Sequence, residues 1–190
     1  MGCRTLQSIE NNPCSGNQGG IKTTVWVGEL TDITITDTYH DAQTKDYITA
    51  ISVAKATGVT TAAVTKFEFR KQISGLTSEM TIDDPNGVFF VTSNLDLVFA
   101  KQETEKRLAM MSLFLNGNMF AIVEDQNGNY HFLGHDNPVT ATAGGAQTGV
   151  ASTDANQYNV TLTDISNELP FIWDATTGAS IVAALSVVSQ

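Results

Sequence analysis

The sequence predicts a mainly β protein with one short helix. The 190-residue chain contains 25 threonines, several stretches alternate apolar and polar residues as strands do, and a single stretch has helical spacing. Threonine is β-branched and carries a small hydroxyl, which suits a strand with one face in water. With 42% apolar residues, the chain can build a sizeable core. We therefore expect one β-rich domain over residues 20–190, preceded by an extended N-terminal arm over residues 1–19.

The strand period recurs through the first half of the chain. Apolar and polar residues alternate over residues 20–27 and again over residues 30–36, whereas residues 37–46 are polar and are expected to form a loop. Further strands are predicted over residues 47–53, 60–71, 77–82 and 87–92, and the usual turn formers from Asp83 to Gly87 separate the last two.

One segment has the spacing of a helix. Over residues 104–115, Leu108, Met111 and Leu115 recur at intervals of three and four residues, and three charged residues occupy the opening turn. An Asn-Gly pair follows, as is common after the last turn of a helix. Met110 and Met111 are expected to fill the core, because methionine does so far more often than it forms a ligand or cofactor site.

A hairpin is the clearest local signal. Residues 119–124 and 129–134 are strand-like and flank Asp125-Gln126-Asn127-Gly128. An Asn-Gly tip favours a type I′ turn, whose two central residues both need positive φ. That register would place Glu124 opposite His131.

In the C-terminal part of the chain, a segment with few large apolar residues is followed by segments that are rich in them. Residues 137–156 are rich in Gly, Ala and Thr and have little to bury, so we expect a long flexible loop there, or a flexible hairpin. Strand alternation resumes over residues 157–165. Residues 169–173 and 181–188 are the apolar segments that close the chain, and no second helix is expected.

The charge is strongly acidic and unevenly distributed. The formal net charge is −10, and all ten Lys and Arg residues lie at or before Arg107, so the last 83 residues carry only acidic charge. This balance disfavours nucleic-acid binding through phosphate neutralisation, which requires Lys and Arg. No apolar stretch reaches the roughly 18 to 20 residues of a membrane-spanning helix. The N-terminus lacks an apolar targeting segment, and Leu6 stands where myristoylation needs Ser or Thr, so neither secretion nor lipidation is expected.

Two cysteines, Cys3 and Cys14, lie in the N-terminal arm. They could close a small loop by a disulfide or supply half of a metal site. A tetrahedral zinc site needs four ligands, and the sequence supplies no CxxC pair or nearby histidine to complete one. A reduced pair in the cytosol is therefore favoured.

The sequence predicts no metal, cofactor or catalytic residues. Residues 125–129 resemble a calcium loop, but Tyr130 stands where the turn glycine belongs, so a hairpin tip is favoured. His131, His135 and Asp136 could approach one divalent ion, although three such residues at a strand end are more often a solvated patch. No nucleophile elbow, phosphate-binding loop or HExxH helix is present, so we expect no enzyme.

Aromatic residues offer an alternative function. Trp26, Trp173 and Tyr130 could form a sugar-binding platform if they lay exposed in a row. Large aromatic side chains are more often buried anchors of a core, and that interpretation is favoured here.

The order of the elements supplies a resemblance. Strands are followed by the helix, by the hairpin ending in Phe132-Leu133-Gly134, by the Gly- and Thr-rich stretch and by the strand Asp154 to Thr163. This order, over about the last half of the chain, resembles tail-tube-like virion structural proteins of tailed bacteriophages. The opening Met1-Gly2-Cys3, with Cys14 and Gly19 to Lys22, is similar to the start of small virion proteins from phages of anaerobic gut bacteria.

The resemblance implies a β-sandwich or half-barrel that self-assembles into hexameric rings, which stack into a tail tube conducting DNA. The implied partners are further copies of the chain and other tail or neck proteins, in a virion made in the host bacterial cytoplasm. DNA would pass without specific binding, since an acidic lining from residue 108 onward would repel phosphate. The alternative is that the acidity serves only solubility, and charge alone does not distinguish the two. The alternatives are a neck or ring protein, a capsid decoration protein, or a carbohydrate-binding adhesive β-sandwich.

Overall fold

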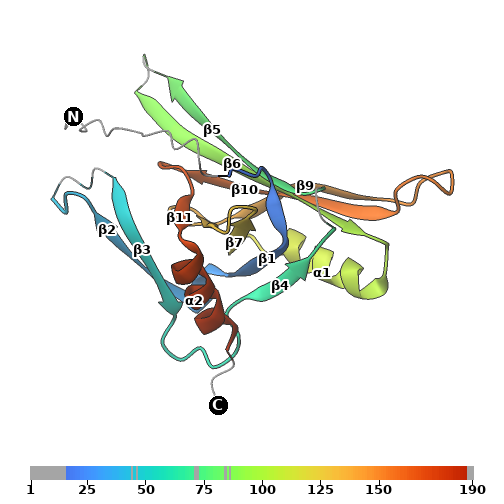
Figure 1. Cartoon of the computed structure of the whole chain (residues 1–190), viewed down its shortest axis with the longest axis horizontal. Helices are drawn as coiled ribbons and strands as arrows, with labels where there is room; N and C mark the ends of the chain where they lie inside the picture. The colour runs from blue at the N-terminus through green and yellow to red at the C-terminus, as the bar shows by residue number, and fades with distance from the viewer. Residues whose placement is uncertain are drawn as a thin grey trace.

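Three antiparallel sheets and two α-helices build the protein (Figure 1). The computed structural model describes residues 16–43, 45, 47–70, 73–83, 85 and 87–187. The predictions for Cys3, Cys14 and most of the N-terminal arm lie outside these residues. The expected mainly β fold class is confirmed, but the expectation of a single helix is wrong.

The strands are distributed over the three sheets as follows. The five-stranded sheet has the order β11-β8-β7-β1-β4, with β1 at Ile21–Glu29, β4 at Thr65–Glu68, β7 at Met119–Asp125, β8 at Tyr130–Leu133 and β11 at Phe171–Trp173. The four-stranded sheet has the order β5-β6-β10-β9, with β5 at Gly75–Asp83, β6 at Val88–Ala100, β9 at Thr140–Gln147 and β10 at Gln157–Ser166. β2 (Ile33–Tyr39) and β3 (Ile48–Lys55) form the third sheet, and a short 3-10 helix (Leu30–Asp32) joins β1 to β2.

The five-stranded sheet is the middle layer, because both of its faces are buried. Met119, Ala121 and Val123 of β7 pack in one cluster with residues of β6, β10 and α1. Phe120 and Ile122, which alternate with them, pack in a second cluster with residues of β2, β3 and the C-terminal helix. A strand that is buried on both faces has a continuous run of apolar residues, and β7 has such a run.

Helix α1 (Thr104–Leu115) has the bounds that the sequence predicts. It packs at the edge of the first cluster and buries Met110 and Leu113. The expectation that Met111 also fills the core is wrong, since its side chain is exposed.

Helix α2 (Ala175–Ser186) is the element that the sequence analysis missed, because the apolar run that begins at Ile181 lies in a helix. The side chain of Asp174 caps it, accepting hydrogen bonds from the backbone N–H groups of Thr176 (2.8 Å) and Thr177 (2.9 Å). Its buried residues Gly178, Val182 and Leu185 have helical spacing and face the second cluster. The sequence signal that could have predicted α2 was Asp174, an N-cap residue placed just before these helically spaced residues.

The β7–β8 hairpin forms as predicted, but its register differs by one residue. Glu124 pairs with Tyr130, and His131 pairs with Val123. The loop has three residues rather than two: Gly128 alone adopts positive φ (+90°), and Asp125 and Asn129 are joined by a 2.8 Å N–H···O bond. The Asp125 carboxylate also accepts the Asn129 N–H, which favours this longer turn over a type I′ turn.

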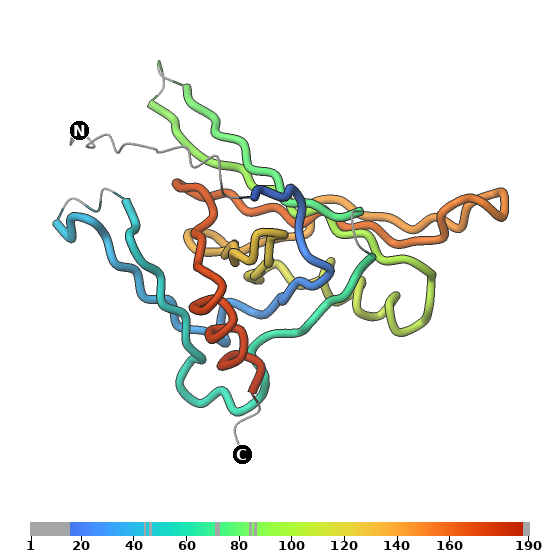
Figure 2. Tube along the Cα trace, viewed as in Figure 1, coloured from blue at the N-terminus to red at the C-terminus, as the bar shows by residue number. Residues whose placement is uncertain are grey.

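Residues 137–156 contain strand β9, so the expectation of a long loop is wrong and the alternative expectation of a hairpin is correct. β9 pairs with β10, and the two strands form an arm that extends beyond the body of the protein (Figure 2). Most side chains of β9 are exposed, which is why its sequence lacks a strand-like apolar pattern. The neighbouring strand supplies its backbone hydrogen bonds, and these do not depend on burial of its side chains.

Strand bounds differ from the prediction in three further places. β2 continues to Tyr39, into the expected loop, and only residues 65–68 of the predicted strand 60–71 pair as β4. β6 continues to Ala100 through a polar stretch that includes buried Ser93. The Ser93 hydroxyl lies 2.8 Å from that of Ser78 on β5, so this buried polar group is satisfied.

The close packing of α2 gives a stability test. A Cβ at Gly178 would lie 2.3 Å from Cγ of Tyr130, whereas a Cβ at Gly117 would meet nothing within 4 Å. We expect Gly178→Val to lower the free energy of unfolding by about 2 kcal/mol through overpacking. Gly117→Val, the matched control, should change it by less than about 0.5 kcal/mol in urea unfolding. Equal effects of the two substitutions would contradict this packing of α2.

Candidate assembly interface

Helix α1 exposes a continuous apolar stripe, which we call the α1 surface: Leu108, Met111 and Leu115. These are the residues whose spacing predicted the helix, and their side chains are between 44% and 81% exposed. The buried residues Met110 and Leu113 lie on the opposite side of the helix. Because α1 is apolar on both sides, burying one side in the core leaves the other without a partner in the described part of the chain.

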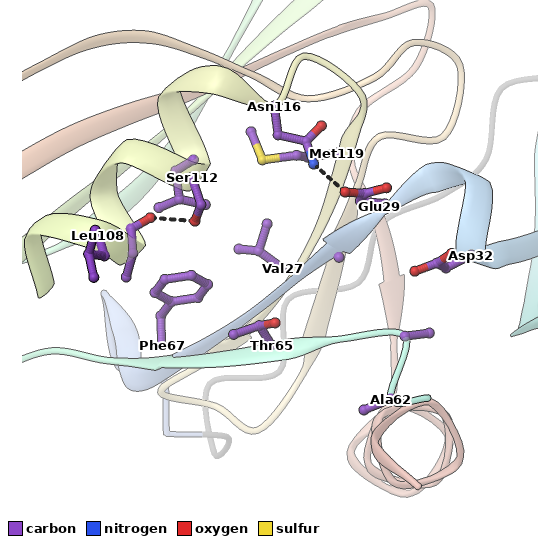
Figure 3. Close-up of a pocket in the computed structure, with 14 residues that line it drawn as sticks. Val27, Glu29, Asp32, Ala62, Thr65, Phe67, Leu108, Ser112, Asn116 and Met119 are labelled. Atoms are coloured by element: carbon purple, nitrogen blue, oxygen red, sulfur yellow. Dashed lines mark hydrogen bonds between the residues drawn. The ribbon is translucent and has the colours of Figure 1, made fainter. Parts of the chain in front are cut away.

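A groove runs beside this stripe (Figure 3). It has a volume of about 530 Å³ and lies between α1 and the strands β1 and β4. Val27 and Phe67 project into it from the strands and Leu108 from the helix, and at one end Asn116 donates a 2.9 Å hydrogen bond to Glu29. Its lining is therefore apolar with a polar rim. β4 is an edge strand of its sheet, so backbone groups are also available on this side.

A second exposed apolar surface lies between the β5–β6 hairpin and the segment that leads into β11. We call it the hairpin surface: Met80, Ile82, Phe89, Leu169 and Ile172. Their side chains are between 41% and 69% exposed. A concavity of about 360 Å³ lies here, and Met80, Phe89, Leu169 and Ile172 are among its lining residues.

The register of β5 and β6 explains the hairpin surface. Met80 pairs with Val91 and Ile82 pairs with Phe89. They lie on the same face of the sheet as the pair formed by buried Leu95 and partly buried Leu76. The core-facing side of the hairpin thus stays apolar beyond the point where the five-stranded sheet covers it. The sequence analysis missed this surface, since its alternation is the same as that of a buried strand.

Neither surface is a feature that an isolated soluble domain needs. Scattered exposed apolar residues are ordinary, but contiguous patches rimmed by polar groups mark sites of interaction. Covering them would remove apolar area from water at about 25 cal/mol per Å². The two surfaces are therefore the best candidates for a functional site in the described residues.

The titratable residues gather elsewhere, around His135. Its Nε2 lies 2.9 Å from Oδ1 of Asp37 on β2, and its Nδ1 lies 3.0 Å from Oδ1 of Asp136. The hydrogen bond to Asp136, supported by that to Asp37, raises the pKa of His135 to about 9. Burial raises the pKa of nearby Asp164 to about 6. The cluster joins the two-stranded sheet to the end of β8, which is a structural role.

The candidate metal ligands are not brought together. His131 lies 3.4 Å from its own carboxylate partner, Asp125, whereas His135 is held by Asp37 and Asp136. Within residues 16–187, apart from the few positions that the structure leaves undescribed, no three His, Cys, Asp or Glu residues are placed to hold a metal ion.

The three aromatic residues of the possible sugar platform do not form an exposed row. Tyr130 and Trp173 are buried, and the indole N–H of Trp173 donates a 2.9 Å hydrogen bond to the carbonyl of Ile51. Trp26 is half-buried, with its ring 5.9 Å from that of Tyr130. All three pack in or against the second cluster, as the core-anchor interpretation predicted.

Comparison of the chain with profiles of known protein families and with curated proteins finds no match. Among the described residues, no helix is both long and apolar enough to cross a membrane.

The His135 cluster predicts a pH dependence of stability. The histidine pKa is 6.5 when unfolded and about 9 when folded, so its contribution is complete below about pH 6.5 and is lost as pH rises through about 9. At 1.36 kcal/mol per pKa unit, this contribution is about 3 kcal/mol. Asp164, whose pKa is raised to about 6, also titrates at the lower end of this range, so the comparison must be made with a variant that keeps Asp164.

We therefore expect the free energy of unfolding to fall between about pH 6 and about pH 10 by about 3 kcal/mol more in the wild type than in His135→Gln. Urea unfolding at the two pH values measures this difference. Parallel pH profiles for the two proteins would show that His135 is not held as a charged group.

Proposed function

We propose that the chain is a non-enzymatic structural protein that self-assembles, as a virion component of the tail-tube type. The observation that carries the proposal is the pair of exposed apolar surfaces, the α1 surface and the hairpin surface. Each consists of side chains whose burial would stabilise an assembly and which the described part of the chain leaves uncovered.

The arrangement of titratable groups supports a role without catalysis. His135, the histidine with the most perturbed pKa, is held between two carboxylates at the junction of two sheets. The concavity beside it has room for about one water molecule, at roughly 20 Å³. A substrate could not enter this concavity, and the grooves at the α1 surface and at the hairpin surface are lined mainly by apolar residues.

The charge distribution supports passage of DNA through an assembled ring. No Lys or Arg follows Arg107 in the sequence, so surfaces built from the C-terminal strands carry acidic side chains such as Asp154 without basic neighbours from that region. A lining of this kind repels phosphate and lets a duplex slide, whereas Lys or Arg would bind it with release of counterions. The hexameric, stacked arrangement is the part of the proposal that rests on the resemblance.

The first experiment is light scattering of the purified full chain across a concentration series, followed by electron microscopy of the largest species. We expect a mass that rises with concentration to a multiple of 20.4 kDa, and rings or stacked tubes in the images. Rings that do not stack would favour the neck, ring or decoration alternatives. A monomer at every concentration would overturn self-assembly.

A further inference from the structure

We infer that the α1 surface of one copy docks against the hairpin surface of the next copy, in a head-to-tail contact. The inference rests on the proposed self-assembly and names the surfaces that meet. It is carried by the spacing of the exposed residues, by their charged neighbours and by the positions of the two surfaces on the molecule.

The α1 surface has the form of a helix that binds in a groove. Leu108, Met111 and Leu115 stand at i, i+3 and i+7, the spacing by which an amphipathic helix places its anchors in an apolar groove. The concavity beside the β5–β6 hairpin offers such a groove, with Met80 and Phe89 on one side and Leu169 and Ile172 on the other. The two surfaces are thus complementary in shape, a ridge and a groove, and alike in being apolar.

The charges beside the two surfaces are also complementary. Arg107 precedes Leu108 and lies one helical turn from Met111, and its exposed guanidinium has no ion-pair partner among the described residues. Of the residues that line the groove, Glu168 is the only charged one. A contact between copies would bring this cation toward this carboxylate, which favours the docked orientation.

The positions of the two surfaces exclude contact within one copy. In Figure 1, α1 lies on the right of the molecule, whereas β11 and the free end of the β5–β6 hairpin lie on the left and upper left. Two unlike surfaces on different sides of a protein give a heterologous contact, which repeats from copy to copy and closes into a ring or extends as a filament. An isologous dimer that used both surfaces would need them side by side on one face of the molecule, whereas Figure 1 shows their elements on different sides.

Two single substitutions test the contact separately. Leu115→Glu places a charge on the α1 surface and Ile172→Glu places one on the hairpin surface; both side chains are exposed, so the fold should be retained, which circular dichroism checks. Each variant alone should associate at least tenfold more weakly than the wild type in sedimentation velocity. Thr57→Glu, in an exposed turn outside both surfaces, adds the same charge and should assemble like the wild type.

Mixing the two variants distinguishes head-to-tail contact from the other arrangements. Leu115→Glu retains an intact hairpin surface and Ile172→Glu retains an intact α1 surface, so an equimolar mixture should form a 1:1 dimer and nothing larger. Impairment of only one variant, or a mixture that remains monomeric, would overturn the inference. So would normal assembly of both variants, although the proposed self-assembly would then stand. A wild-type chain that never associates would remove the proposed function itself.

Discussion

The fold depends on a sheet that must be covered on both faces. In β7, Phe120 and Ile122 point toward one cluster and Met119, Ala121 and Val123 toward the other, and all five side chains are buried. A strand of this kind cannot lie at the surface, so the four-stranded sheet and α1 cover one face while the two-stranded sheet and α2 cover the other. The outer layers are held in place chiefly by what they cover, and their own outward sides are left to face solvent or a partner.

This layering accounts for the two exposed surfaces. α1 packs at the edge of the first cluster and can bury only one of its two apolar sides. The β5–β6 hairpin is longer than the sheet beneath it, so Met80, Ile82 and Phe89 continue the apolar face past the region that the central sheet covers. Both surfaces thus arise from the same mismatch between the size of the central layer and the apolar area of the layers around it.

Local sequence patterns predicted local structure well. They failed where an element depends on contacts with residues distant in the sequence. The bounds of α1 and the existence of the β7–β8 hairpin follow from spacing and turn residues. α2 was missed because its apolar run was interpreted without the cap at Asp174. β9 was expected only as a hairpin alternative to a loop, because a strand whose side chains are exposed has no apolar alternation. The hairpin register was displaced by the Asp125 carboxylate, a side-chain contact that residue statistics at the tip do not show. The exposed surfaces could not be predicted, because exposure depends on whether another layer of the protein covers a given face. The spacing of Leu108, Met111 and Leu115 is the same whether these side chains are buried or exposed.

The continuity of β6 has a consequence for the dimensions of an assembly. This strand runs from Val88 to Ala100, with Phe89 of the hairpin surface near its beginning and α1 starting a few residues after its end. At about 3.3 Å per residue, thirteen residues span roughly 40 Å. β5 and β10 pair along β6 on its two sides, so this length is stiff. If consecutive copies meet through these surfaces, the length and twist of β6 set the spacing and rotation from one copy to the next. They would therefore decide whether the copies close into a ring or continue as a filament.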